Sequence, residues 1–314
     1  MKALDDEQQV NRLPVDDPGF HQSWFPVARA RELGSGAVLG VDFLGTRVAV
    51  YRGPTGKPVV QSAWCPHLGA DLSIGEIVNG QIRCAYHHWR FDDAGICADI
   101  PTGGKIPRGA RIFTYPSAEA WGLVWAFNGE RPLFDVPRIP GIEEREVAFE
   151  PHLRGVRPVP HWVPTSNGVD FQHLRTLHNL PTGAPEAIEV LDYSIEYHIE
   201  TASYRQLGLI TGTNVFAQYL RRAGVDSFML FAGAPIDQQR TRSFFVVGVR
   251  RDGDGDLRLQ IDGLRSFVEK LLAEDEPILN TMRFKQGVMV ASDRHLSRYF
   301  KYVSEFPKYG PPGP

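Results

Sequence analysis

The sequence predicts an α+β protein with two domains: an N-terminal all-β domain, and a C-terminal domain that combines a sheet with a long helix. Its 314 residues exceed one small module, and 42% of them are hydrophobic, which suffices for a sizeable core. Short alternating segments punctuated by Gly and Pro fill the first part, and helical apolar spacing marks the last part. We expect a polar lead at residues 1–20, a first domain at 21–135 and a second at 136–314.

The first domain is predicted to consist of short strands. Five segments between about residues 25 and 127 alternate apolar and polar residues in the manner of half-buried strands. They are AVLGVDFL, RVAVYRG, PVVQSAW, QIRCAYH and GLVWAFN. Residues 128–160 are rich in Pro, cannot form a continuous helix, and predict an irregular connection across a domain surface.

The second domain is predicted to begin with a helix over SNGVDFQHLRTLH, with Ser166 as its N-cap. Four strand segments follow, namely DYSIEYHIE, TNVFAQYL, SFMLFAG and RSFFVVGVR. The segment GLRSFVEKLLAEDEPILNTMRF then has helical spacing, and Pro277 is expected to start or kink that helix. A last helix is predicted over SDRHLSRYFKYVSEF.

Composition argues against several classes of protein. The formal net charge is −3 and the basic residues are dispersed, so we expect no nucleic-acid partner. No apolar run is long enough for a membrane span, and the polar start MKALDDEQQV does not resemble a signal peptide. Three cysteines cannot all pair with one another, which predicts a reduced, cytoplasmic protein.

Two short runs carry strong metal ligands. The pattern is Cys65-x-His67, sixteen residues, then Cys84-x-x-His87. A zinc site is one interpretation, because two Cys and two His are a common zinc set. Each run supplies one thiolate and one imidazole, however, which favours a [2Fe–2S] cluster with two Cys on one iron and two His on the other.

The stretches CPHLGADL and CAYHHWRFD resemble the motif of Rieske-type aromatic-ring-hydroxylating oxygenases, and HQSWFPVA at 21–28 is similar to the start of their Rieske domain. Respiratory Rieske proteins carry two further cysteines, at the positions of Ala70 and Tyr86, that form a disulfide. Their absence indicates the oxygenase or ferredoxin branch. Cys97 lies outside the motif and is expected to be a buried structural residue.

A second metal site is predicted in NGVDFQHLRTLH. His173 and His178 with a nearby carboxylate suggest a 2-His-1-carboxylate iron(II) site that admits dioxygen. Five residues of helix would turn the two rings about 140° apart, so the helix must bend or end between them. The alternative is a pair of ordinary histidines at a helix end.

The same stretch resembles the oxygenase motif Asn/Glu-x2-Asp-x2-His-x4-His. The resemblance implies that His173 and His178 bind the mononuclear iron and that Asn167 lies near it. It also implies that Asp170 bridges an iron-ligand histidine and the cluster histidine His87.

The third iron ligand is expected in a late helix, where the resemblance places an aspartate. LLAEDEPIL offers Glu274, Asp275 and Glu276. We select Asp275 and keep Glu274 and Asp262 as alternatives. The plain interpretation of such an acidic run is a solvated helix face.

The substrate pocket is expected between the iron helix and the late strands. Its candidate lining residues, which are equally consistent with ordinary core, are Phe171, Leu174, Leu177, Phe216, Phe228 and Phe231. An apolar pocket would suit an aromatic, polycyclic or terpenoid-like substrate. Residues 179–190 are a candidate cover over the entrance.

By this resemblance the chain is a terminal (alpha) oxygenase subunit with a helix-grip catalytic domain, and it forms a head-to-tail homotrimer. It would hydroxylate or oxidatively demethylate its substrate, and monooxygenation is favoured over dioxygenation. The sequence has no Gly-x-Gly-x-x-Gly fingerprint, so NAD(P)H-derived electrons would arrive through a separate ferredoxin or flavin reductase. Two alternatives are a Rieske electron-transfer protein fused to a non-catalytic ligand-binding domain, and a zinc-stabilised binding module.

Overall fold

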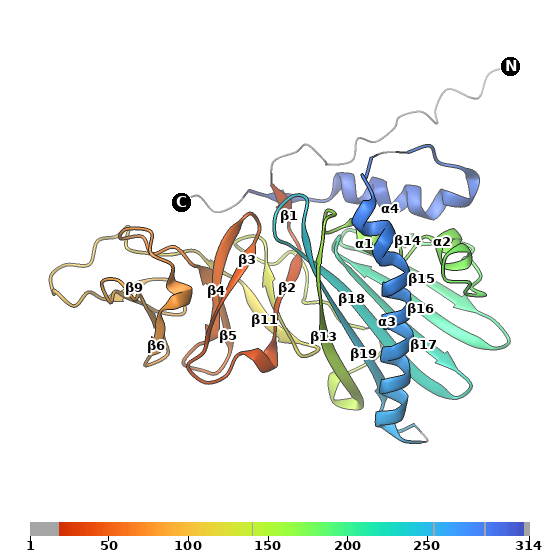
Figure 1. Ribbon diagram of the computed structural model, residues 1–314, viewed down its shortest axis with the longest axis horizontal. Coiled ribbons are helices and arrows are strands. Elements are labelled where there is room, and N and C mark those ends of the chain that lie inside the picture. The colour runs from red at the N-terminus through yellow and green to blue at the C-terminus, as the bar shows by residue number, and fades with distance from the viewer. Residues whose placement is uncertain (1–18, 140, 254, 286, 311–314) are drawn as a thin grey trace, which may run out of the picture.

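The computed structural model describes residues 19–139, 141–253, 255–285 and 287–310 (Figure 1). Small sheets from the first part of the chain lie at one end of an elongated molecule, and a large sheet crossed by a long helix lies at the other (Figure 1). This arrangement confirms the predicted α+β class. The expected lead at 1–20 lies outside the described residues except for its last two, and the domain boundary near 135 stays a prediction.

The first part of the chain forms three sheets, with strand orders β10-β5-β4-β3, β11-β12-β2 and β6-β7-β8-β9. A two-stranded sheet of β1 and β20 joins the start of the described chain to its end. The strands are β1 (Phe20–His21), β2 (Trp24–Arg29), β3 (Val38–Phe43), β4 (Thr46–Arg52), β5 (Pro58–Ser62), β6 (Glu76–Val78), β7 (Gln81–Arg83), β8 (Arg90–Phe91), β9 (Cys97–Asp99), β10 (Thr114–Tyr115), β11 (Ser117–Ala120), β12 (Leu123–Phe127) and β20 (Lys308–Tyr309). Short 3-10 turns are η1 (Ala30–Glu32), η2 (Leu72–Ile74), η3 (Glu144–Glu146) and η4 (Ala291–Asp293).

The second part forms a seven-stranded antiparallel sheet of order β13-β19-β18-β17-β16-β15-β14. Its strands are β13 (Val147–Arg157), β14 (Glu189–Val190), β15 (Ser194–Glu200), β16 (Tyr204–Thr211), β17 (Val215–Arg222), β18 (Val225–Pro235) and β19 (Thr241–Arg250). The helices are α1 (Val163–Ser166), α2 (Phe171–Thr176), α3 (Leu257–Thr281) and α4 (Arg294–Glu305). Helix α3 packs on β13 and β19 through buried residues such as Ile261 and Val268. None of the described helices is long and apolar enough to cross a membrane.

Strands β13 and β16 were not predicted. The Pro-rich stretch 128–160 was expected to be irregular, yet β13 occupies its second half and pairs Pro151 with Val246 of β19. Pro is tolerated there because β13 is the edge of the sheet. In β16, Gly208 lies against the Tyr197 ring, so closely that a Cβ would meet the ring carbons. Gly in a strand often marks such a close approach, and here it weakened the strand pattern in the sequence.

The helix predicted over SNGVDFQHLRTLH is two short helices. Ser166 ends α1 instead of capping it, so the predicted N-cap was wrong. The chain breaks at Gly168, where a Cβ would collide with the Phe216 ring, and α2 starts anew with Asp170 as its N-cap. The predicted late helices are present as α3 and α4, but α3 starts after its N-cap Asp256 and runs through Pro277, which is therefore not its start.

Two buried histidines join the two parts of the molecule. His21 Nδ1 lies 3.0 Å from His161 Nε2, and the Thr213 hydroxyl lies 2.9 Å from the same His21 nitrogen. Both rings are buried, at 1% and 4% exposure. Burial lowers the pKa of His161 to about 3 and also lowers the pKa of His21 well below its usual value. Both histidines are therefore neutral in the folded protein at neutral pH.

We expect the free energy of unfolding to fall as the pH drops below about 6.5. The unfolded chain binds protons at these two histidines there, whereas the folded chain binds them only at a much lower pH. For His161 alone the loss between about pH 8 and about pH 5 is on the order of 2 kcal/mol. Urea unfolding of wild type and His161→Gln at both pH values measures it. His198→Gln, which changes an exposed histidine, is the control. If the free energy of unfolding depends on pH as steeply in His161→Gln as in the wild type, this account is wrong.

Candidate metal centres

Both Cys/His runs lie on loops of the small β6–β9 sheet or directly before it. Cys65 and Cys84 are buried, at 2% and 1% exposure, whereas His67 and His87 are exposed. The rings of the two histidines approach each other with centroids 4.6 Å apart, and His67 stacks on Trp89. The thiol end of the site therefore faces the core and the imidazole end faces solvent.

The two loops share one backbone pattern. The carbonyl of Cys65 accepts from the Gly69 N–H and that of Cys84 from the His88 N–H, at 2.8 and 3.0 Å. Gly69 and His88 both have a positive φ, of 73° and 58°. The N–H of each cysteine donates in turn to the carbonyl five residues on, which is Ala70 or Trp89. Two equivalent tight turns thus present one Cys and one His each.

These residues fit a [2Fe–2S] cluster. Burial, together with a smaller contribution from the neighbouring Cys84 thiol, raises the pKa of the Cys65 thiol to about 11. A thiolate at that place therefore needs a nearby cation, which the irons of a cluster would provide. Cys97 is free and buried in β9, as predicted for a structural cysteine.

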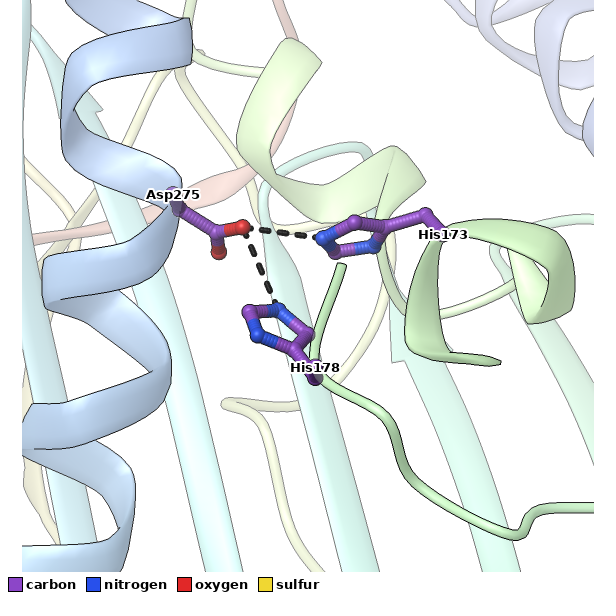
Figure 2. A group of neighbouring side chains, drawn as sticks. All are labelled: His173, His178 and Asp275. Carbon is purple, nitrogen blue, oxygen red and sulfur yellow. Dashed lines mark hydrogen bonds and ion pairs between the residues drawn. The ribbon is translucent and has the colours of Figure 1, made fainter. Parts of the chain in front are cut away.

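His173, His178 and Asp275 converge in the second part of the chain, where their side chains point toward one another (Figure 2). His173 Nε2 lies 2.8 Å from Asp275 Oδ1, and His178 Nε2 lies 3.2 Å from the same oxygen. His173 comes from α2 and Asp275 from α3 (Figure 2). Helix α2 ends at Thr176, so His178 lies in the following loop and its ring turns back toward His173, as the five-residue spacing required.

The three residues fit one iron(II). Two imidazole nitrogens and one carboxylate oxygen are the donor set of 2-His-1-carboxylate sites. Their possible ligand atoms all lie within 4.8 Å of one another, and the 2.8 and 3.2 Å spacings match the roughly 3 Å between adjacent ligands of one octahedral ion. Among the described residues this is the one such group with metal-binding spacing.

The three successive carboxylates in the acidic run of α3 make different contacts. Glu274 Oε2 lies 2.7 Å from His178 Nδ1, Asp275 faces both histidines, and Glu276 pairs with Arg154 at 2.8 Å. Of the two alternative ligands, Glu274 therefore contacts the far side of a histidine. Asp262 pairs with Arg265, at 2.8 Å.

Asn167, directly after α1, and Asp170, directly before α2, support the group. The Asn167 amide donates to Asp275 Oδ2 at 3.3 Å, so it touches the carboxylate that faces both histidines. Asp170 Oδ1 accepts the backbone N–H of His173 at 2.9 Å and so caps α2. The ring nitrogen Nδ1 of His173 is buried without a hydrogen-bond partner among the described residues. The bond expected from Asp170 to an iron-site imidazole is thus absent in the single chain.

A cavity of about 360 Å³ opens at the His173, His178 and Asp275 group. Leu174, Phe216 and Phe231 line it as predicted. Phe171 and Phe228 pack into the core instead, and Leu177 is not part of the lining. Leu180, Pro181 and Thr182 also line the cavity, which places the start of the candidate cover at its wall.

Sequence reasoning missed Glu274 as a partner of His178, and it missed two arginines of β13, Arg154 and Arg157, in the cavity wall. The position of Glu274 beside Asp275 was a signal for the first. Arg154 and Arg157 lie in the Pro-rich stretch that was not assigned a strand, so no sequence signal pointed to them.

Residues 23–116 match the family model described as "Rieske [2Fe-2S] domain". "Cholesterol 7-desaturase nvd" from Bombyx mori is 33% identical over 215 residues, which cover 65% of this chain and 45% of that protein. "Aminopyrrolnitrin oxygenase PrnD" from Pseudomonas fluorescens is 35% identical over 179 residues, which cover 52% of this chain and 47% of that protein. The chain thus spans less than half of the length of these curated relatives.

The fold agrees with solved structures. "Pseudomonas putida CBB5 NdmB" superposes with a TM-score of 0.79 at 18% identity and covers 93% of both chains. "Pseudomonas putida CBB5 NdmA with caffeine" superposes with a TM-score of 0.77 at 19% identity and covers 90% of both chains. The chain is a homologue of the Rieske-type non-haem iron oxygenases. The match to the Rieske domain confirms the predicted [2Fe–2S] domain and decides against the zinc interpretation.

In this Rieske-type homologue we expect Glu274→Gln to weaken iron(II) binding about 10- to 100-fold. The Glu274 carboxylate can only accept a hydrogen bond, so it keeps the proton of His178 on Nδ1 and leaves the Nε2 lone pair facing Asp275. The amide of a glutamine can also donate, so it would no longer fix that tautomer. Competition with an iron(II) chelator measures the change. Glu269→Gln, an exposed position of the same helix, is the matched control, and equal iron retention in both variants would contradict the role.

Proposed function

We propose that the chain is the terminal oxygenase component of a Rieske non-haem iron system. The observation that carries the proposal is the His173, His178 and Asp275 group at the wall of a largely apolar cavity, in a chain that also has a Rieske domain. A non-catalytic ligand-binding domain would not require two imidazoles and a carboxylate converging on one point.

The proposed roles follow from the geometry. Cys65, His67, Cys84 and His87 hold the cluster, and His173, His178 and Asp275 hold the iron(II). Bound iron with open coordination positions would supply the activation of dioxygen. Glu274 fixes the His178 ring, Asn167 orients the Asp275 carboxylate, and Leu174, Phe216 and Phe231 hold the substrate against the iron group and exclude water.

Electrons are proposed to cross between subunits. The β6–β9 sheet with its two loops and α2 with His173 lie at opposite ends of the molecule (Figure 1). Transfer within one chain would span most of its long axis, whereas the exposed His67 and His87 can approach the Asp170 side of another copy. A head-to-tail homotrimer closes such contacts into a ring. The upstream donor would be a separate ferredoxin or flavin reductase fed by NAD(P)H.

The proposed reaction is monooxygenation, that is hydroxylation or oxidative demethylation, of a substrate with an aromatic or polycyclic body. The cavity volume suits a molecule of one to a few rings. The names of relatives support this range, since they include a cholesterol desaturase and an aminopyrrolnitrin oxygenase. The cytoplasmic location expected from the free cysteines stays a prediction.

Metal analysis of anaerobically purified wild type and His173→Ala tests this function. We expect about three irons and two acid-labile sulfides per chain in the wild type, and about two irons with an unchanged visible spectrum in the variant. His198→Ala, an exposed histidine of β15, is the control and should keep the third iron.

If wild type reconstituted with iron(II) holds only the two cluster irons, the electron-transfer alternative replaces the oxygenase. A colourless protein with zinc would contradict both. The protein could also hold all of its iron, yet take up no oxygen when the reduced form is mixed with a panel of aromatic substrates. In that case the metal assignment stands and the proposed reaction is contradicted.

A further inference from the structure

The cavity wall carries a positive charge that the iron group does not explain. The charged lining residues outside that group are all arginines, namely Arg154, Arg157 and Arg222. Arg222 is exposed, whereas Arg157 is 7% exposed. The only acidic residue among the described lining residues is Asp275, which faces the two histidines.

A β-bulge aims Arg154 and Arg157 at the same face of β13. Residues three apart on a regular strand point to opposite faces. In β13 the register with β19 shifts between Leu153 and Gly155, so Arg154 is an extra residue and the alternation is reset. Bulges re-aim side chains in this way and are frequent beside active sites.

One carboxylate serves both arginines. Glu276 lies 2.8 Å from Arg154 Nη2 and 3.4 Å from Arg157 Nη1. Arg154 Nε is buried and has no hydrogen-bond partner in the described part of the chain. The contacts of Arg157 use Nη1 alone, on Glu276 and the Val156 carbonyl, which leaves the other guanidinium donors free among the described residues. Because two guanidinium groups share one carboxylate, the cluster of Arg154, Arg157 and Glu276 keeps a net charge of one positive unit in a poorly hydrated part of the cavity wall.

We propose that the substrate carries a carboxylate, which Arg157 binds with the help of Arg154, on an aromatic body that packs on Leu174, Phe216 and Phe231. An unpaired buried charge is costly, and a planar guanidinium matches a carboxylate in two-point geometry. This subsite fixes one end of the substrate and so selects which carbon faces the iron group. The inference rests on the proposed function, because it names the substrate class of that same site.

Calorimetric titration of the anaerobic holoprotein with matched probes tests the subsite. The probes are benzoate, 2-naphthoate and 4-phenylbenzoate, each beside its neutral amide. We expect the acid of the best-fitting pair to bind at least about tenfold more tightly than its amide in the wild type. The preference should fall to about threefold or less in Arg157→Gln, and it should persist in Arg205→Gln, which removes an exposed arginine of β16 outside the cavity.

Glu276→Gln separates ligand binding from a merely structural ion pair. The Glu276 carboxylate competes with an acid probe for both guanidinium groups. Its removal should tighten the binding of the acid probe by about threefold or more and leave the affinity for the amide unchanged. If the arginines only anchor α3, this variant would weaken both probes alike. That result, or the lack of any acid preference in all three wild-type pairs, overturns the proposal.

Iron content of the same samples keeps the two proposals apart. If the samples hold all of their iron but bind the acid no more tightly than its amide, the proposed carboxylate subsite is wrong and the oxygenase proposal stands. If they bind the acid more tightly than its amide but hold no iron at His173 and His178, the subsite is supported and the oxygenase proposal is wrong.

Discussion

Asp170→Asn is expected to lower turnover by about a hundredfold or more while the cluster and the mononuclear iron stay bound. Asparagine caps helices as well as aspartate does, so the bond to the His173 N–H and the start of α2 should survive. The substitution removes the negative charge of a group that only accepts hydrogen bonds, at the start of α2, the helix that carries His173. An uncharged amide would hold the cluster histidine of a second copy poorly.

Iron and sulfide content together with substrate-dependent oxygen uptake measure this effect, and single-turnover reduction of the iron site would locate it in electron transfer. Asp256→Asn is the matched control, because Asp256 also caps a helix by accepting backbone N–H groups, at the far end of α3. Normal turnover in Asp170→Asn would remove the bridging role. Loss of iron in that variant would show instead that Asp170 acts through the iron site.

Asp275→Ala is expected to lose the mononuclear iron almost completely and to abolish turnover, with the cluster spectrum intact. The carboxylate lies 2.8 Å and 3.2 Å from the two imidazole nitrogens, so its removal would delete one of the three proposed ligands and the anion that would balance the charge of the ion. The small β6–β9 sheet with the two Cys/His loops lies at the other end of the molecule, so the cluster proposed there should not respond (Figure 1).

Metal analysis after iron(II) reconstitution, with the visible spectrum as the internal reference, measures the loss. Asp262→Ala on the same helix is the control, since Asp262 pairs with Arg265 away from the group. Stoichiometric iron in Asp275→Ala would transfer the ligand role to another residue, and Glu274, on the opposite nitrogen of His178, would be the first to test.

Local chemistry explains why the two groups of candidate metal ligands could be found from the sequence. Cys65 and His67 share one loop and Cys84 and His87 another, so short spacings already hold each pair together. The five-residue spacing of His173 and His178 required the helix to end between them, and α2 does end at Thr176. The resemblance placed one acidic residue of α3 near them, and the structure brings Asp275 there.

Only the tertiary structure decided the features that depend on distant segments. Three adjacent acids of α3 are alike in the sequence, and the packing of α3 on β13 and β19 determines that Asp275 faces the histidines while Glu276 faces Arg154. Pro151 argued against a strand, yet the edge position of β13 tolerates it. The bulge that turns Arg154 toward the cavity is a register shift between two strands about ninety residues apart in the chain, and single-strand patterns do not encode such a shift.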